Sequence, residues 1–383
     1  EAALDRKLLY QSLPEVMKEY FLRGKRNFVV SGTHGKTTTS SMLAWLLENA
    51  GKNPGFMIGG LPKNLDCGAR FTESKFTVLE GDEYDTAFFD KRSKFLHYLP
   101  ECVVINNIEF DHADIYASLD EIKLTFRRLL NIVPRTGMAF VNGDDPNCLE
   151  VASKAPCPVT TVGFSAECDL RIENINYDEH RSSFTLGGTP CSVRMAGEFN
   201  VRNAAMAAVS AGLLLDARDP TKLKLEALNA FQGVQRRQQV LVDRPDLTVI
   251  EDFGHHPTAL DLTLASLRAR YPRHRLVACF EPRSNTAARK VMQDAFREAL
   301  KQADEVFLAP PHRADKLGEE RFDSAGVAAA ITAAGKEGFA PASNEALLAE
   351  LTAVVKGDRS PRCVIFFSNG AFGGIIKKFA QAV

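Results

Sequence analysis

Apolar and polar positions along the chain follow two alternating patterns: short apolar runs that predict strands, and longer stretches with helical spacing. In the first half, the strand-like runs are 27–30, 76–80 and 102–106, and the helix-like stretches are 5–23, 36–49, 120–131 and 203–215. Amphipathic helices carry apolar residues three or four positions apart, whereas strands buried on both faces are continuously apolar. Strands that alternate with helices form mostly parallel sheets. The first half therefore predicts an α/β domain.

Residues 158–198 carry a different pattern, in which short apolar segments alternate in steps of two. Gly187 and Gly188 lie between the last two of these segments, and a glycine pair in that position is typical of a hairpin turn. We expect a small antiparallel meander, with 158–162 as its first strand, appended to the parallel sheet.

A second alternating series begins near residue 240. Its strand-like runs are 247–251, 275–280, 305–309 and 363–368, and its helix-like stretches are 257–270, 286–302, 324–334, 345–356 and 373–382. The polar and basic stretch 232–237 separates the two series, so we place a domain boundary near residue 238. The prediction is a leading helix in 1–24, a central phosphate-loop domain in 25–238 and a Rossmann-like α/β domain in 239–383.

Charge and cysteine content exclude several classes of protein. The 47 lysines and arginines nearly cancel the 48 aspartates and glutamates, so the chain as a whole offers no electrostatic attraction to nucleic acid or to an anionic membrane. No apolar run approaches the roughly 18 residues that span a bilayer, and we expect no membrane insertion. The eight cysteines form no C-x-x-C pair, which favours a reducing, cytoplasmic location over a disulfide framework or a zinc site.

The strongest candidate for chemistry is the segment 32–38, a glycine turn between a strand and a helix. Glycines let backbone N–H groups point at a phosphate, and the helix N-terminus adds partial positive charge. Lys36 can reach terminal phosphates, and the hydroxyl that follows it can bind Mg²⁺. Val30 replaces the first glycine of the longer phosphate-loop pattern, so the motif is a shortened one. The candidate nucleotide contacts in this segment are Gly32, Thr33, His34, Gly35, Lys36, Thr37 and Thr38.

Carboxylates follow the next two strand-like runs. Glu80 opens the acidic segment 80–85, and His112 lies between Asp111 and Asp114. Ligand sites in α/β sheets occur just beyond the carboxyl ends of parallel strands. Carboxylate oxygens suit Mg²⁺, and a histidine can bind a second metal ion or a phosphate. We therefore expect both segments to lie beside the phosphate loop.

The second series has a similar polar strand end after 247–251. Asp252, His255 and His256 lie on a turn before a helix. Two adjacent histidines seldom form a zinc site alone, and no cysteine motif joins them. At the domain junction, Arg236 and Arg237 can close on nucleotide phosphates when domains move together.

A further polar strand end follows the run 275–280. Arg283, Ser284 and Asn285 occur there, and arginine binds carboxylates through two parallel hydrogen bonds. Simple loop chemistry explains these residues equally well. The candidate contacts with a carboxylate-bearing substrate are His255, Arg283, Ser284 and Asn285.

These motifs, in this order, resemble the Mur ligase family of ATP-dependent enzymes that form amide bonds, and the resemblance covers nearly the whole chain. The matching segments are 32–39, 80–83, 107–112, 199–203 and 252–257. The resemblance implies that Lys36 stabilises the migrating phosphoryl group, that Thr37 and Glu80 bind Mg²⁺, and that His112 serves a second Mg²⁺. The other nucleotide contacts that it implies are Asn200, Asn203, Arg237 and Asp252. The candidate catalytic residues are Lys36, Glu80, His112 and Arg237.

Within the family, three segments are more similar to members that act on a peptide than to members that add L-alanine. These segments are 84–95, 109–114 and 280–286. The resemblance implies that the tripeptide L-alanyl-γ-D-glutamyl-meso-diaminopimelate is joined to UDP-N-acetylmuramate, during recycling of the cell wall. By the family's mechanism, ATP phosphorylates the muramate carboxylate and the amine of the peptide then displaces phosphate.

Two alternatives remain open at this point. The acceptor can instead be L-alanine, or glutamate on a folate-like substrate. Family members also carry an N-terminal domain that binds the UDP part, and the chain begins at Glu1 without a methionine, in what resembles the last helix of that domain. We therefore expect that the UDP-binding domain is missing, which would leave a nucleotide-binding module without catalysis as the other alternative.

Overall fold

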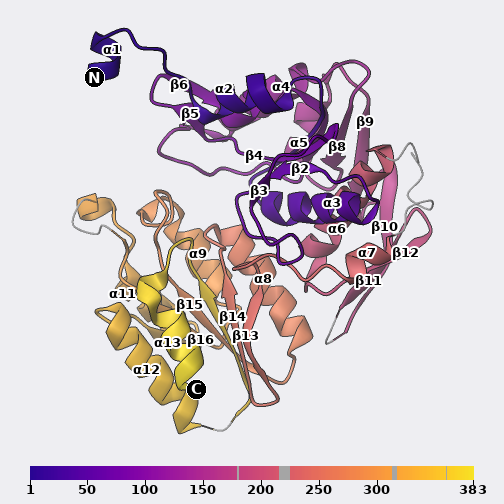
Figure 1. Ribbon diagram of the computed structural model, residues 1–383. Coiled ribbons are helices and arrows are strands. Elements are labelled where there is room, and N and C mark those ends of the chain that lie inside the picture. The colour runs from indigo at the N-terminus through magenta and orange to yellow at the C-terminus, as the bar shows by residue number, and fades with distance from the viewer. Residues whose placement is uncertain (179–180, 215–224, 313–316, 359) are drawn as a thin grey trace. The chain divides into compact units, whose positions relative to one another are not determined.

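The computed structural model describes residues 1–178, 181–214, 225–312, 317–358 and 360–383 (Figure 1). The chain forms two compact units. The first comprises 1–175, 183–192 and 201–232, and the second comprises 176–182, 193–200 and 233–383. The second unit thus includes two short segments from before residue 201, which a division at one point of the sequence does not predict.

One sheet of ten strands organises the first unit, in the order β12-β11-β10-β9-β8-β7-β1-β4-β2-β3. Its strands are β1 (Arg26–Ser31), β2 (Gly55–Met57), β3 (Ala69–Arg70), β4 (Phe76–Gly81), β7 (Pro100–Ile105), β8 (Met138–Asn142), β9 (Val159–Gly163), β10 (Leu170–Tyr177), β11 (Ser182–Leu186) and β12 (Thr189–Val193). β1 pairs in parallel with β4 and with β7, and β7 pairs in parallel with β8. The mainly parallel α/β sheet is therefore confirmed.

Helices cover this sheet because its central strands are apolar on both faces. Val29 of β1 and Val103 of β7 pack with Phe126 of α4 (Leu119–Asn131) and with Cys148 of α5 (Pro146–Ala152). On β1, Phe28 and Val30 are fully buried as well. The remaining helices that concern the site are α3 (Lys36–Asn49), α6 (Glu198–Leu214) and α7 (Glu226–Asn229). The predicted helix 203–215 corresponds to α6, and its last residue lies outside the described residues.

The leading helix predicted over 5–23 is wrong in its extent. A short α1 covers Ala2–Asp5, and α2 (Leu13–Met17) continues into a π-helical turn, Lys18–Leu22. Ser12 accepts a hydrogen bond from the backbone of Glu15, whose side chain accepts one from Ser12 N. This capping box, with Pro14 in the first turn, starts the helix at residue 13, because proline lacks the N–H that a longer helix would need there.

The meander is only partly as predicted. β9, expected as its first antiparallel strand, pairs in parallel with β8 and with β10, so it continues the parallel sheet. β10, at 170–177, was not predicted, because its apolar alternation is interrupted by polar residues. β11 and β12 are joined by Gly187 and Gly188 alone, and a two-residue connection joins antiparallel strands.

A six-stranded sheet organises the second unit, in the order β13-β14-β18-β15-β16-β17. Its strands are β13 (Gln239–Arg244), β14 (Leu247–Asp252), β15 (Arg275–Phe280), β16 (Glu305–Leu308), β17 (Glu337–Phe339) and β18 (Arg362–Phe367). The edge strand β13 is antiparallel to β14, and the other neighbours are parallel. This agrees with the predicted α/β fold of the second series.

Alternate residues of β15 enter two separate cores. Leu276, Ala278 and Phe280 pack with α8 (Pro257–Arg270), α9 (Gln293–Leu300) and α11 (Ser324–Ala333). Val277 and Cys279 pack with α12 (Asn344–Gly357) and α13 (Ile375–Ala382), which lie together in Figure 1. Helices thus cover both faces, as in doubly wound folds.

The helix predicted over 286–302 is shorter in the structure. Arg289 is extended and forms a bridge with Arg321, so the regular part of α9 begins only at Gln293. In the described part of the chain, no helix combines the length and the hydropathy that crossing a bilayer requires.

Candidate active site

The turn between β1 and α3 is built around two glycines. Gly32 has φ +128°, and a Cβ there would lie 3.0 Å from the backbone atoms of Asn106 and Asn107. Gly35 has φ +79° and directly precedes α3. Non-glycine residues adopt neither conformation readily. The two glycines therefore let the turn curl against the end of β7. Because the N-cap of α3 is Gly35, no N-cap side chain accepts hydrogen bonds from the first N–H groups of the helix.

Residues beyond β7 stabilise this turn. Asn107 accepts hydrogen bonds from His34 N through Oδ1 at 2.7 Å and from Thr33 N through its carbonyl at 3.1 Å. Thr33 Oγ1 donates to the carbonyl of Glu109 and accepts from Glu109 N. Because β1, β4 and β7 are parallel and in register at Ser31, the segments that follow them meet at one edge of the sheet. The expected neighbourhood of 32–38, 80–85 and 106–114 is therefore present.

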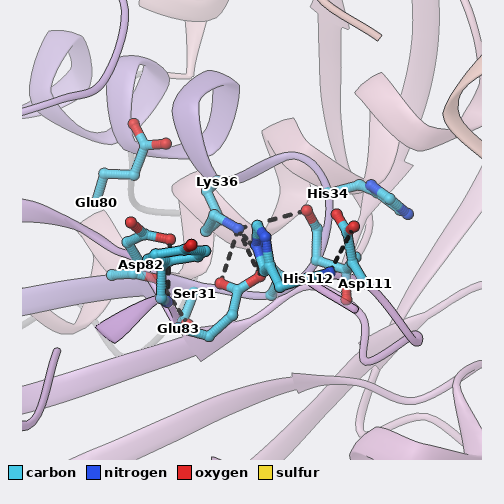
Figure 2. A network of polar contacts seen from close by, with 12 residues as sticks. Ser31, His34, Lys36, Glu80, Asp82, Glu83, Asp111 and His112 are labelled. Carbon is cyan, nitrogen blue, oxygen red and sulfur yellow. Dashed lines mark hydrogen bonds and ion pairs between the residues drawn. The ribbon is translucent and has the colours of Figure 1, made fainter. Parts of the chain in front are cut away.

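Lys36 forms an ion pair that the sequence did not single out. Its Nζ lies 3.1 and 2.9 Å from the two carboxylate oxygens of Glu83 and 2.6 Å from the carbonyl oxygen of Gly32 (Figure 2). Burial works against the charged ammonium, but the carboxylates of Glu83 and Asp82 outweigh it and raise the pKa of Lys36 above its usual value. Lys36 is therefore a largely buried lysine, with 13% of its side chain exposed, that is held by a carboxylate.

His112 lies on the other side of the same carboxylate. Its Nε2 is 3.4 Å from Glu83 Oε1, and its backbone has φ +54°. Burial lowers the tendency of the ring to take a proton, yet the hydrogen bond to Glu83 and the charge of Glu83 together raise the pKa of His112 above its usual value. Asp82, Glu83 and His112 offer ligand atoms within 4.8 Å of one another.

Glu80 and Thr37 form a second polar pair at the same edge. Thr37 Oγ1 donates to Glu80 Oε1 at 2.8 Å, and Gly59 N donates to Glu80 Oε2 at 2.6 Å. Figure 2 shows the Glu80 side chain directed away from Glu83 and His112. The structure thus brings Thr37 and Glu80 together, as the predicted magnesium site requires.

Asn203 of α6 packs against the phosphate turn. It is buried, and its Oδ1 accepts a hydrogen bond from Thr39 Oγ1 at 3.2 Å. Asn106 Nδ2 donates to Thr39 Oγ1 at 3.1 Å. Asn200 belongs to the second unit, where its Nδ2 donates to the carbonyl of Ala196 and to Gln238 Oε1.

In the second unit, Asp252 ends β14 in a buried position. Its carboxylate accepts hydrogen bonds from the backbone N–H groups of Gln238 at 2.8 Å and Gly254 at 2.6 Å. Burial dominates and raises the pKa of Asp252, although the nearby Arg237 partly opposes this. The guanidinium of Arg237 lies 4.8 Å from the ring of Phe253. The ring of His255 contacts Phe253 edge-on.

Arg283 lies beyond β15 beside a buried acid, Glu281. Arg283 Nη1 is 3.4 Å from Glu281 Oε1, and Ser368 Oγ, beyond the neighbouring β18, donates to Glu281 Oε2. Ser284 Oγ accepts a hydrogen bond from Ala287 N, so this hydroxyl stabilises the local turn. Asn285 is exposed. Arg283 therefore combines partial burial with a charged partner.

Sequence reasoning missed Glu83 and Glu281 as site residues. Glu83 is one of four acidic residues in the segment 80–85, and the spacing alone does not distinguish which of them contacts Lys36. Glu281 occurs in a segment that we had singled out for its arginine. In both cases the only signal in the sequence is an acidic residue just beyond a buried strand. Acidic residues are common in such surface loops, so this signal does not identify a site residue.

Comparison with known proteins relates the whole chain to one family. The description "Mur ligase middle domain" matches residues 30–211, and "Mur ligase, glutamate ligase domain" matches residues 236–370. A UDP-N-acetylmuramate–L-alanyl-gamma-D-glutamyl-meso-2,6-diaminoheptandioate ligase of Escherichia coli K12 is 36% identical over 387 residues, which cover 100% of this chain and 81% of that protein. A UDP-N-acetylmuramate–L-alanine ligase of Polaromonas sp. is 34% identical, with 84% of this chain and 69% of that protein covered. The crystal structure of a murein peptide ligase of Psychrobacter arcticus 273-4 has a TM-score of 0.70 and 30% identity, covering 100% of this chain and 82% of that one.

These comparisons bear on the expectations drawn from the motifs. The resemblance and the fold class are confirmed. The chain spans 81% of the length of its two ligase relatives from Escherichia coli and Haemophilus influenzae. These matches do not support the expected lack of an N-terminal domain, which stays a prediction. The roles of individual site residues and the boundary near 238 stay predictions too. Because a relative at 36% identity is matched along all of this sequence, the chain belongs to the Mur ligase family.

Proposed function

We propose that this chain is an ATP-dependent ligase that joins L-alanyl-γ-D-glutamyl-meso-diaminopimelate to UDP-N-acetylmuramate. The name of the Escherichia coli relative, which is similar over the whole chain, supports this choice of substrates. The observation that carries the chemistry is the ion pair of Lys36 with the buried Glu83, at the edge of the sheet where Thr37 and Glu80 also meet. An ATP-dependent reaction and eight unpaired cysteines favour a cytoplasmic location.

The residues present fit ATP and Mg²⁺. A Cβ at Gly32 or Gly35 would press on Asn106, Asn107 or Asn203, so glycine lets the turn at 32–35 take the curled form of a phosphate-binding loop. Thr37 Oγ1 and Glu80 Oε1, 2.8 Å apart, are oxygen ligands of the kind that Mg²⁺ prefers. In our proposal Thr37 and Glu80 bind one Mg²⁺ and His112 serves a second. When bound, the metal neutralises the charge of the phosphates.

The reaction needs little covalent help from the protein. The γ-phosphoryl group of ATP forms a bond to the carboxylate oxygen of the muramyl group, and the bond to ADP breaks. The amine of the peptide then attacks the carbonyl carbon, loses a proton and displaces phosphate. Lys36 stabilises the charge on the migrating phosphoryl group, and the backbone N–H groups at the start of α3 orient it.

The remaining residues are assigned from the family resemblance. We assign Asn200 and Asn203 to the adenine side, Arg237 to the phosphates and Asp252 to the nucleotide. His255, Arg283, Ser284 and Asn285 are assigned to the incoming peptide. The ion pair of Arg283 with Glu281 supports Arg283 most, because it fixes the guanidinium without using all of its N–H groups.

Product analysis tests the proposal. The chain is incubated with ATP, Mg²⁺ and UDP-N-acetylmuramate, and with either the tripeptide or L-alanine, and products are identified by mass spectrometry. We expect the tripeptide adduct together with equal amounts of ADP and phosphate. Preference for L-alanine would refute the peptide assignment in favour of the activity named for the Polaromonas relative. ATP binding without any product would leave only the nucleotide-binding module.

Replacement of the lysine tests the phosphate assignment. We expect Lys36→Ala to lower product formation by at least about 100-fold, because a charge aimed at the transition state is lost. The matched control is Lys301→Ala, which removes an ammonium paired with Glu298 at the surface of the second unit and should leave turnover unchanged. Circular dichroism confirms folding of both variants. Undiminished turnover in Lys36→Ala would contradict the role of the turn.

A further inference from the structure

Glu83 is buried at the centre of the candidate site, with only 2% of its side chain exposed. The predictions from sequence gave it no role of its own. Both carboxylate oxygens contact Lys36 Nζ, and Oε1 also contacts His112 Nε2. On its backbone, the carbonyl oxygen accepts a hydrogen bond from Tyr116 Oη at 2.6 Å. The carboxylate is therefore fixed between a lysine and a histidine.

The contacts of Lys36 occupy its hydrogen-bonding capacity. An ammonium group donates three hydrogen bonds, and Lys36 Nζ has the Gly32 carbonyl at 2.6 Å and the two Glu83 oxygens at 3.1 and 2.9 Å, with the Thr33 carbonyl at 3.4 Å. A phosphate that binds Lys36 must therefore replace one of these acceptors. Among them, only the carboxylate carries a charge, so it is the one that an anionic phosphate can replace with the charge of the lysine still compensated.

We propose that Glu83 is a positioning residue that holds Lys36 and His112 in the nucleotide-free protein and yields Lys36 to the phosphates of ATP. This inference rests on the proposed function. It assigns to the free protein a lysine that is charged and oriented before ATP enters. Glu83 competes with the nucleotide for that lysine, and by remaining beside His112 it keeps the histidine in place.

The proposal predicts opposite effects on binding and on turnover. In Glu83→Gln, the largely buried charge of Lys36 loses the carboxylate that it contacts and keeps only the longer-range attraction of Asp82 and Glu80, which is unfavourable in the free protein. ATP supplies the missing negative charge, so its affinity should rise by at least about tenfold. Turnover should fall, because Lys36 and His112 are no longer oriented. A role in folding alone would lower stability without raising the affinity for ATP.

Calorimetry of ATP binding to the full chain, in EDTA so that no magnesium is present, gives the binding readout. The matched control is Glu305→Gln in the second unit, whose carboxylate is equally buried and pairs with Arg275 at 2.7 Å and Arg362 at 3.4 Å. It should lower stability and leave ATP affinity unchanged. Steady-state assays then give kcat and the KM for ATP, and both should fall in Glu83→Gln.

Each outcome decides the matter. Unchanged or weakened ATP binding by Glu83→Gln, with normal binding by the unmodified chain, overturns the role of Glu83 and leaves the proposed function intact. Absence of ATP binding by the unmodified chain overturns both. If Glu83→Gln does not fold, Glu83→Asp replaces it, since aspartate keeps the charge but is too short to bridge Lys36 and His112. Wild-type affinity and turnover in Glu83→Asp would also overturn the proposal.

Discussion

Substitution of two glycines at opposite ends of α3 can distinguish the cost of backbone strain from the cost of a steric clash. Gly35 precedes the helix with φ +79°, and Gly51 follows it with φ +69°. A Cβ at Gly51 would meet nothing within 4 Å. At Gly35 it would overlap the carboxamide oxygen of Asn203 and lie 2.9 Å from Asn106 Nδ2. The two alanine variants would therefore adopt nearly the same φ, but only the alanine at position 35 would clash with neighbouring side chains.

The structure sets the expected magnitudes. Each alanine should lose about 1 kcal/mol because it must adopt the left-handed conformation. Gly35→Ala must also displace Asn203, which breaks its hydrogen bond with Thr39 in a buried position. A buried polar group left without its partner costs a further 1–3 kcal/mol or so. We expect Gly35→Ala to be less stable than Gly51→Ala by about 1–3 kcal/mol.

The single tryptophan makes this measurable for the first unit alone. Trp45 lies within α3, and its Nε1 donates to the carbonyl of Ala227 at 2.8 Å. Its fluorescence during urea denaturation gives the free energy of unfolding by linear extrapolation. Equal losses in the two variants would refute the packing argument, and a larger loss in Gly51→Ala would refute the geometry of the turn itself.

Two further predictions concern stability. Asp304 is partly buried, which opposes its ionisation, but hydrogen bonds from Arg268 and Leu276 N outweigh this and hold its pKa below the usual value. The contribution of Asp304 to the free energy of unfolding is therefore present above the unfolded-state pKa of about 4 and is lost as the pH falls further. Asp304→Asn should lower the free energy of unfolding at pH 7 and approach the wild type in acid. A constant difference between pH 7 and pH 2 would contradict this. Asp145 caps α5 through Oδ1 and accepts from Ile108 N through Oδ2 at 2.9 Å. We expect Asp145→Ala to lose about 1–2 kcal/mol in urea denaturation and Asp145→Asn to recover only the cap; full recovery by asparagine would show that the bond to Ile108 contributes nothing.

Much of the fold could be predicted from local sequence. The helix α3 begins and ends where the glycines predict, and α8 begins at Pro257 as expected. Local signals were insufficient where tertiary pairing competes with them. β9 looked like part of a meander, yet it lies beside β8 and is parallel to it, because strand direction depends on the connection that precedes it. Within the expected helix 286–302, Arg289 instead pairs with Arg321.

The candidate site shows the same division. By itself the sequence determined that phosphate-binding glycines, a lysine and several acidic residues follow buried strands, because these are properties of residue type and spacing. Only the tertiary structure decided that Lys36 pairs with Glu83, that Thr37 pairs with Glu80, and that Asn203 supports the glycine turn. Residues 36, 83 and 203 are far apart in the chain. Lys36 and Glu83 meet because parallel strands bring their carboxyl ends to one edge of the sheet, and burial there makes each charge depend on its partner. Asn203 reaches the turn from helix α6 instead.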